Sequence, residues 1–276
     1  MRSYLSEFYS LKMSCRIMKM SPNNFYYKRV DRKAKDAPVL KLIQEFFEMF
    51  PNLGLPSVTR HLKKTMKINK KRIERIMKEN GLMNRKKAKK QAKTTNSSHK
   101  FQKFENLLKG REKTSKINEV IVGDVTAFDI KGVNHYLALL MDLHSREIVG
   151  SAVSEKNDTE LVLAALSEAL KYRGSLEGVI HHTDADVRYC SDEYVMKLKE
   201  NKMMISMCVG NAYENAHAES LNKTVKYGEI NISDYDTVQE AASGIFLFAE
   251  RYNSVRPHSA HEGLSPLEFA RQCISK

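Results

Sequence analysis

At 276 residues, of which 42% are apolar, the chain can form one large domain or two to three smaller ones, each with its own core. No stretch approaches the ~18 consecutive apolar residues of a membrane span, and charged residues interrupt the first twenty positions, where a signal peptide would need an apolar core. The four cysteines show no CxxC pair or zinc-type spacing, so we expect buried or free thiols in a reducing cytosol.

Charge is distributed unevenly between the two parts of the chain. Residues 1–116 hold 31 lysines and arginines against 9 acidic residues, a balance of +22, whereas residues 117–276 have a balance of −9. A strongly basic half joined to an acidic half indicates a polyanion-binding module attached to something else. Nucleic acid is the polyanion that this charge fits best, although a solvated basic surface would give the same count.

The first 84 residues predict short helices that form a DNA-binding region. Two short helices are expected within residues 5–30, and Asp36 is expected to cap a third. A shorter helix follows Pro56-Ser57, and Asn69 caps the next, which ends at Gly81. Helix, short turn and helix in succession make a helix-turn-helix candidate.

The second helix of that candidate has a basic outward face, which suits a recognition helix approaching a major groove. An ordinary amphipathic helix with a lysine-rich solvent face is the alternative, and the charge of the surrounding chain favours DNA binding. The candidate DNA-binding residues on this face are Lys70, Lys71, Arg72, Arg75 and Lys78.

Residues 85–116 are predicted to be a basic linker, and from residue 117 the pattern changes. Strands are expected at 119–128, 134–143, 147–154, 177–184 and 203–208, and helices after Asp158 and at 191–202, 214–227 and 236–252. This order is that of a ribonuclease H-like domain with a central first strand. The fold class is therefore α+β: a helical helix-turn-helix region followed by a five-stranded mixed sheet with flanking helices.

Three acidic residues stand in contexts that ought to exclude a lone charge. Asp124 interrupts an apolar strand, Asp184 ends the neighbouring strand, and Glu219 lies on a helix that crosses their end. A carboxylate in a strand core costs several kcal/mol unless something compensates it. Converging carboxylates form a hard-oxygen site for Mg²⁺ or Mn²⁺, and two such ions can activate the attacking oxygen and stabilise the leaving oxygen of a phosphoryl transfer.

Each of these acids alone would more simply be a helix cap, a strand end or an ion-pair partner. Their order along the predicted fold favours the catalytic interpretation. Lys226 lies two helical turns after Glu219 on the same face and can contact a phosphate. Histidines 181, 182 and 217 are interpreted as packing or hydrogen-bonding groups rather than as general bases.

The same residues carry a family resemblance. Residues 210–220, GNAYENAHAES, closely resemble the GNxYDNAxxES segment of insertion-element transposases whose second reading frame, OrfB, has an integrase-like core. Residues 123–126 are similar to the segment of their first aspartate, and residues 182–191 to their HSDxGxQYxS segment. Residues 252–258 match their YNxxRPH motif, and residues 264–266 match the L[ST]P that follows it.

The resemblance implies a bacterial DNA transposase with a DDE integrase-like core, which cuts the 3′ ends of its element and joins them to target DNA. It implies that Asp124, Asp184 and Glu219 bind two Mg²⁺ (or Mn²⁺) ions, that Lys226 holds DNA, and that Arg256 and His258 contact DNA or brace the active-site helix. Expected partners are element ends and target DNA, further copies of the chain on that DNA, and an upstream OrfA or an OrfAB fusion, without a membrane. The expected location is the bacterial cytoplasm, at the nucleoid.

Two positions depart from the family pattern. The family glycine and glutamine after the second aspartate are Asp186 and Arg188 in this chain. Asp186 places a further negative charge beside the expected metal site and lacks the backbone freedom of glycine. A catalytically impaired, DNA-binding transposase remnant or regulator of transposition therefore remains the alternative function.

Overall fold

The computed structural model describes residues 7–21, 31–83, 99–110, 113–208 and 216–275. The chain divides into two compact units, Met1–Leu42 and Ile43–Lys276, and each is described by itself. Before residue 84, the described residues include the helices α2 (Leu11–Ile17), α4 (Arg32–Met49), α5 (Leu55–Thr65) and α6 (Lys70–Glu79). The predicted division into 1–84, 85–116 and 117–276 stays a prediction.

The start of helix α4 corrects one expectation. Asp36 does not cap this helix, because α4 begins at Arg32 and runs through Asp36 and Pro38. Asp31 takes the capping role instead: its Oδ1 accepts hydrogen bonds from the backbone N–H groups of Lys33 (2.9 Å) and Ala34 (3.3 Å). Pro38 therefore lies inside the helix, which continues past it although proline lacks the N–H that an interior position would donate.

Helices α5 and α6 form as the sequence predicts. Asn69 Oδ1 accepts a hydrogen bond from the Lys71 N–H (2.9 Å) and so caps α6. At the other end Gly81 adopts a φ of +69°, and the Leu82 N–H donates to the Met77 carbonyl (2.8 Å), which is a Schellman ending. The apolar residues on the inner faces of these two helices, Val58, Leu62, Ile73, Ile76 and Met77, are all buried.

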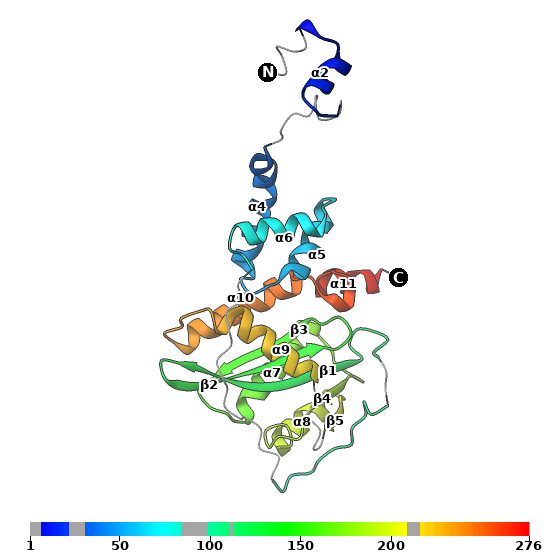
Figure 1. Ribbon diagram of the computed structural model, residues 1–276. Coiled ribbons are helices and arrows are strands. Elements are labelled where there is room, and N and C mark those ends of the chain that lie inside the picture. The colour runs from blue at the N-terminus through cyan, green and yellow to red at the C-terminus, as the bar shows by residue number, and fades with distance from the viewer. Residues whose placement is uncertain (1–6, 22–30, 84–98, 111–112, 209–215, 276) are drawn as a thin grey trace. The chain divides into compact units, whose positions relative to one another are not determined.

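A five-stranded mixed sheet forms the centre of the second unit, and its strand order is β3-β2-β1-β4-β5 (Figure 1). The strands are β1 (Val120–Ile130), β2 (Val133–Asp142), β3 (Ile148–Ser154), β4 (Ile180–Asp184) and β5 (Met204–Cys208). The first three strands pair antiparallel, whereas β4 pairs parallel with β1 and with β5. The expected fold class and the central position of the first strand are confirmed.

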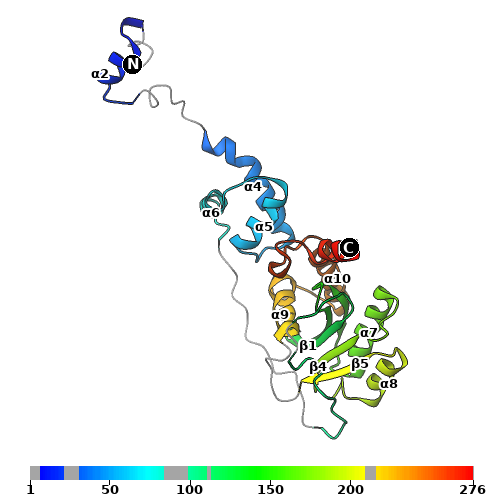
Figure 2. The same cartoon turned by 90° about the vertical axis from the view of Figure 1, so that its right-hand side faces the viewer.

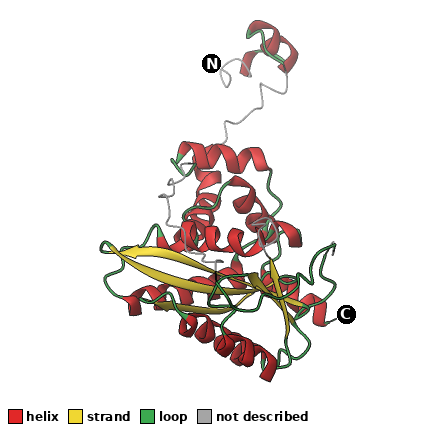
Figure 3. Cartoon of the chain, turned by 90° about the horizontal axis from the view of Figure 1, so that it is seen from below, coloured by secondary structure: helices red, strands yellow, loops and turns green. Residues whose placement is uncertain are grey.

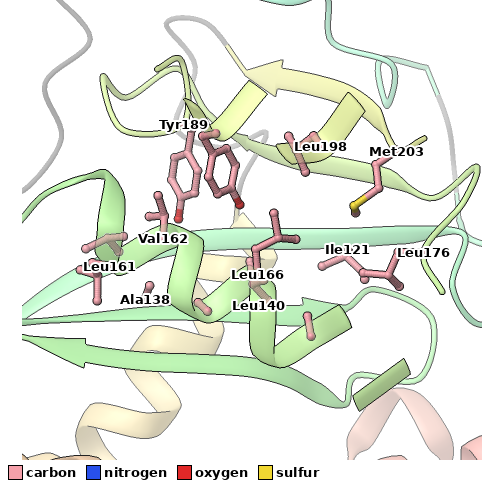
Figure 4. Packing of buried hydrophobic residues seen from close by; sticks show 14 of the residues in the cluster. Ile121, Ala138, Leu140, Leu161, Val162, Leu166, Leu176, Tyr189, Leu198 and Met203 are labelled. Atoms are coloured by element: carbon pink, nitrogen blue, oxygen red, sulfur yellow. The ribbon is translucent and has the colours of Figure 1, made fainter. Parts of the chain in front are cut away.

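Helices cover both faces of the sheet (Figures 2 and 3). Helices α7 (Thr159–Arg173) and α8 (Asp192–Glu200) pack on one face, and α9 (Ala216–Val225) and α10 (Val238–Val255) cover the other. Side chains from α7 and α8 meet alternate residues of the strands in a single apolar cluster (Figure 4). Ile121 and Val125 of β1 point into this cluster. Because strand side chains alternate between faces, Asp124 points to the opposite face, toward α9.

Gly150 of β3 permits the close approach of α7. A Cβ atom at this position would overlap the carbonyl oxygen of Ala165 and lie 3.1 Å from the Ala169 nitrogen. We expect Gly150→Ala to lower the free energy of unfolding by about 3 kcal/mol, because backbone atoms of α7 cannot move aside. Chemical denaturation measures this loss. Gly132→Ala is the control: its Cβ meets nothing within 4 Å, so only its φ of +85° should cost stability, about 1 kcal/mol.

Residues from the predicted linker range border the sheet at β5. The Met207 N–H donates to the Glu105 carbonyl (3.3 Å), and the Leu107 N–H donates to Ser206 Oγ (2.9 Å). Phe104 packs against the apolar cluster. This stretch therefore covers the outer edge of β5, which would otherwise expose unpaired backbone groups. Residues 84–98, which hold half of the predicted linker's lysines, lie outside the described residues.

The C-terminal part contains a helix that the sequence analysis did not predict, α11 (Pro266–Ile274). Ser265 and Glu268 form a capping box at its start, and Pro266 occupies the first turn. Residues 264–266, which match the family's L[ST]P segment, therefore form the start of this helix.

Asn253 of α10 exchanges two hydrogen bonds of 2.9 Å with the backbone of Ile148 and so fixes α10 to the first residue of β3. No helix in the described parts is long and apolar enough to cross a membrane.

Candidate active site

Asp124 is held on the α9 face of the sheet by two hydrogen bonds. Its Oδ1 accepts from the N–H of Val125 (2.9 Å), and its Oδ2 accepts from the Nδ2 of Asn222 on α9 (2.8 Å). Asn222 itself is buried, as are Ala218, Leu221 and Val225, which fix the rotation of the helix on β1 and β2 as predicted. The Asn222 contact therefore joins the central strand to the helix that carries Glu219.

Asp184 ends β4 beside Asp124. The parallel register pairs Val122 with His182, so the two aspartates occupy equivalent positions two residues further along their strands. Both are partly exposed at this edge. Burial and then the Asp184 charge raise the pKa of Asp124 to about 7; the Val125 and Asn222 hydrogen bonds oppose this rise, and Glu219 adds to it. Asp184 and Glu219 therefore both lie close enough to Asp124 for their charges to affect its carboxylate.

Glu219 lies in the first turn of α9, and its side chain is 42% exposed. One carboxylate oxygen lies 4.0 Å from Lys223 Nζ, so the side chain leans toward that lysine. Accordingly, no three Asp, Glu, His or Cys side chains in the described part of the chain are close enough to hold a metal ion as they stand. Residues 209–215, directly before α9, are outside the description.

The donor set nevertheless fits a divalent cation. Three carboxylates whose mutual repulsion raises a pKa provide the anionic oxygen ligands that Mg²⁺ and Mn²⁺ prefer. The Oδ1 atom of Asn222 is also buried, with no hydrogen-bond partner within the described residues. Asp124 and Asp184 lie on strands β1 and β4, and Asp124 is further held by its two hydrogen bonds.

Asp124→Asn should stabilise the metal-free chain at pH 8. Because the folded-state pKa of about 7 lies above the ordinary value of 3.8, the carboxylate lowers stability as the pH rises through this range. The full shift corresponds to ~4 kcal/mol and partial exposure reduces it, so we expect a gain of roughly 2 kcal/mol. Thermal melting in EDTA at pH 8 and pH 4 measures it. A gain of the same size at pH 4 would contradict the electrostatic cause.

Lys226 is buried at the end of α9, where the helix widens into a π turn over Lys226–Ile230. Burial lowers the pKa of its amine to about 8, and the nearby Asp124 charge partly opposes this effect. The same turn brings Gly228 against the ring of Phe248. Lys226 thus faces the carboxylate site, as its spacing from Glu219 predicts, and its contact with DNA stays a prediction.

Asp186 and Arg188 neutralise each other. Both side chains are buried, with exposures of 1% and 3%. The Arg188 guanidinium pairs with Asp186 Oδ1 and also donates a hydrogen bond to Asn157 Oδ1, in the loop before α7. Asp186 does not have a positive φ, so the backbone freedom of the family glycine is not needed here. The extra negative charge that the sequence places near Asp184 therefore has its own counter-ion.

The basic face of α6 is exposed in part. Lys70, Lys71 and Lys78 are exposed, whereas Arg72 and Arg75 are partly covered. Two acids share the helix with them: Arg75 pairs with Glu79 and Lys78 with Glu74, each at 2.9 Å. Such exposed i, i+4 pairs are weak and can exchange for phosphate contacts. A DNA-binding role for all five residues stays a prediction.

Arg256 and His258 pack at the end of α10. The guanidinium carbon of Arg256 lies 5.3 Å from the centre of the Tyr252 ring. His258 Nδ1 accepts a hydrogen bond from the Ala260 N–H (3.3 Å), and burial followed by cationic neighbours lowers the pKa of its ring to about 3. Both residues therefore make contacts within the chain at the C-terminal end of α10. A contact of either with DNA stays a prediction.

Two histidines of β4 are structural, as interpreted from the sequence. His181 is hydrogen-bonded to the Tyr194 hydroxyl (2.9 Å), and burial lowers its pKa to about 4. His182 is hydrogen-bonded to Ser206 Oγ (2.8 Å). The hydrogen bond from Asn222 to Asp124 was not predicted from the sequence. The contact in which Arg146 Nη1 donates to His217 Nδ1 (2.9 Å) was not predicted either, and no spacing in the sequence signals that pair.

Models of known protein families match the sequence of this chain. A family model described as "Integrase core domain" matches residues 114–211, and a second with the same description matches residues 204–266. A model described as "HTH-like domain" matches residues 33–90. A subunit in the cryo-EM structure of a simian T-cell lymphotropic virus intasome with a PP2A regulatory subunit aligns with a TM-score of 0.50 and 14% identity, over 79% of this chain and 70% of that one.

Bacterial relatives share the sequence. The chain is 30% identical to the protein named transposase InsK of insertion sequence element IS150 from Escherichia coli K12, over 97% of this chain and 96% of that protein. It is 35% identical to the transposase of IS904 from Lactococcus lactis, over 60% of this chain and 66% of that protein. An integrase core of this kind is a polynucleotidyl transferase that depends on a divalent metal. The chain belongs to the insertion-sequence transposases that have an integrase core domain and a helix-turn-helix-like region.

Proposed function

We propose that the chain cuts the 3′ ends of its insertion element and joins them to target DNA by a two-metal mechanism. The observation that supports this proposal is the placement of Asp124 and Asp184 at the same level of neighbouring parallel strands, with the pKa of Asp124 raised by burial, by Asp184 and, less, by Glu219. Two Mg²⁺ or Mn²⁺ ions held there would activate the attacking oxygen and stabilise the leaving oxygen.

The chain's own residues have separate tasks in this mechanism. Asp124 and Asp184 provide fixed oxygen ligands at the ends of neighbouring strands, and Glu219 completes the set from α9. Asn222 holds Asp124 in place through the 2.8 Å hydrogen bond. Lys226, whose pKa of about 8 leaves it mostly charged at neutral pH, adds positive charge beside the substrate phosphate.

The basic N-terminal region would bind the element ends, with the outward face of α6 against the major groove. We further propose that several copies act together on DNA at the nucleoid, and that an upstream OrfA, alone or as an OrfAB fusion, supplies end recognition. Salt-sensitive binding without any metal-dependent product is the result expected of an impaired remnant. The paired state of Asp186 argues against that alternative.

A strand-transfer assay tests this function. The substrates are a labelled duplex with the element's end sequence, the same duplex already cut at its 3′ end, and a target plasmid. We expect Mn²⁺-dependent nicking of the first duplex and joining of the second to the plasmid, both abolished by EDTA. Nicking without joining would instead indicate a plain nuclease, and binding without any product would indicate a remnant.

A further inference from the structure

Positively charged side chains gather beside α9, on the flank opposite Glu219. His217 and Glu219 are two residues apart, about 200° around the helix, and so they point away from each other. His217 meets Arg146, which comes from the turn between β2 and β3. Because His217 Nδ1 accepts the hydrogen bond from Arg146, its Nε2 carries the proton and can donate.

Arg256 and His258 lie near Arg146. Burial raises the pKa of the Tyr252 hydroxyl, and the Arg256 and Arg146 guanidinium groups both oppose that rise, so both lie near this ring. The pKa of His258 is lowered by burial and then by His261, Arg146, Arg256 and Arg60. Burial and the Arg146 charge likewise lower the pKa of His217. Burial first, and the Arg146 charge after it, therefore disfavour the protonated forms of His217 and His258.

Counter-charge is lacking at this cluster. Within the described residues, neither Arg146 nor Arg256 forms an ion pair with a carboxylate. Asp142 is the acid that acts on Arg146, but its oxygens accept hydrogen bonds from the backbone N–H groups of Asn118, His144 and Ser145. The Nε atom of Arg146 is buried without a hydrogen-bond partner in the described part of the structure. A guanidinium group that is partly buried and uncompensated costs free energy, which a bound anion would offset.

We propose that Arg146, with His217 and Arg256 beside it, binds a backbone phosphate of the DNA other than the scissile one. The planar guanidinium fork matches phosphate oxygens, and the unpartnered Nε adds a donor. Because α9 with its side chains is about 10–12 Å wide, a phosphate on this flank is separate from the phosphate at the carboxylates. DNA would thus contact both flanks of α9. The site rests on the proposed function only in taking DNA as the ligand.

Salt dependence of DNA binding tests the site without any catalytic step. Binding of Arg146→Gln to a duplex is measured in EDTA between 50 and 200 mM salt, with Lys197→Gln on α8 as a control that removes one charge on the other face of the sheet. Loss of one phosphate contact should reduce the slope of log K against log salt by about 0.9 and weaken binding roughly five- to tenfold. Arg146→Lys should restore most of the slope. An unchanged slope, or an equal change in Lys197→Gln, would overturn the proposal.

A measurement on the unmodified protein covers the case in which Arg146→Gln does not fold. Arginines are modified with phenylglyoxal, with and without duplex DNA, and located by mass spectrometry. We expect DNA to protect Arg146 from modification, and modification at an equal rate would overturn the proposed site. The strand-transfer assay is independent of this result: protection of Arg146 in a chain that makes no product would keep the phosphate site and remove the proposed function.

Discussion

Glu219→Gln is expected to abolish metal-dependent cleavage and joining while leaving DNA binding intact. Glutamine keeps the size of the side chain but removes its charge, and a neutral amide is a weak ligand for Mg²⁺. In the proposed mechanism two metal ions would stabilise the charge that develops at the reacting oxygens, so we expect a loss of at least about 10³-fold in the rate. Single-turnover cleavage of a labelled element end measures this rate, and a gel shift measures binding.

Two observations separate this effect from damage to the fold. Glu219 is 42% exposed and its charge raises the pKa of Asp124, so its removal should leave the melting temperature unchanged or slightly higher. Lys223→Gln removes the 4.0 Å ion pair of Glu219 and leaves the carboxylate in place, so this control should keep most of the activity. Full cleavage by Glu219→Gln would sink the assignment of Glu219 as a metal ligand.

The alternation of strand side chains and the order of elements predicted where the three proposed metal-binding carboxylates lie in the fold. Asp124 stands in an apolar strand, and its neighbours Val122 and Val125 are buried as their pattern requires. The order of strands and helices then places Asp184 beside it, and the apolar stripe of α9 sets which flank carries Glu219. These inferences rest on the order of the elements and on the repeat of apolar residues in strands and helices, both of which can be read from short stretches of the sequence.

Contacts made by long polar side chains between distant segments were not predictable in this way. Arg146 meets His217 across 71 positions, and Asn253 fixes Ile148 across 105. Neither pair has a spacing that a local pattern could reveal. Asp36 failed as a cap for a related reason: the choice between Asp31 and Asp36 depends on where α4 begins, and Pro38 is compatible with either start.

The buried pair of Asp186 and Arg188 leads to the second large effect. Sequence alone presented these residues as two departures from the family pattern, whereas their pairing makes them a single change. We expect Asp186→Asn to cost about 3–5 kcal/mol of unfolding free energy, because Arg188, with 3% exposure, would keep its charge while losing the carboxylate that pairs with it. Arg188→Gln removes the guanidinium that pairs with Asp186, and it should lower the unfolding free energy by a similar amount.

The double variant Asp186→Gly, Arg188→Gln restores the residues of the family pattern and removes both charges together. Removal of a whole buried ion pair is often close to neutral, so the double variant should be more stable than either single variant, with a coupling energy of about 2 kcal/mol or more. The double variant should also have more strand-transfer activity than either single variant, because neither charge of the pair is then left alone beside Asp184. Urea denaturation and the strand-transfer assay on all four proteins measure the cycle. If the losses of unfolding free energy in the two single variants simply added in the double variant, Asp186 and Arg188 would act independently. The Asp186 charge would then again be an argument for a catalytically impaired protein.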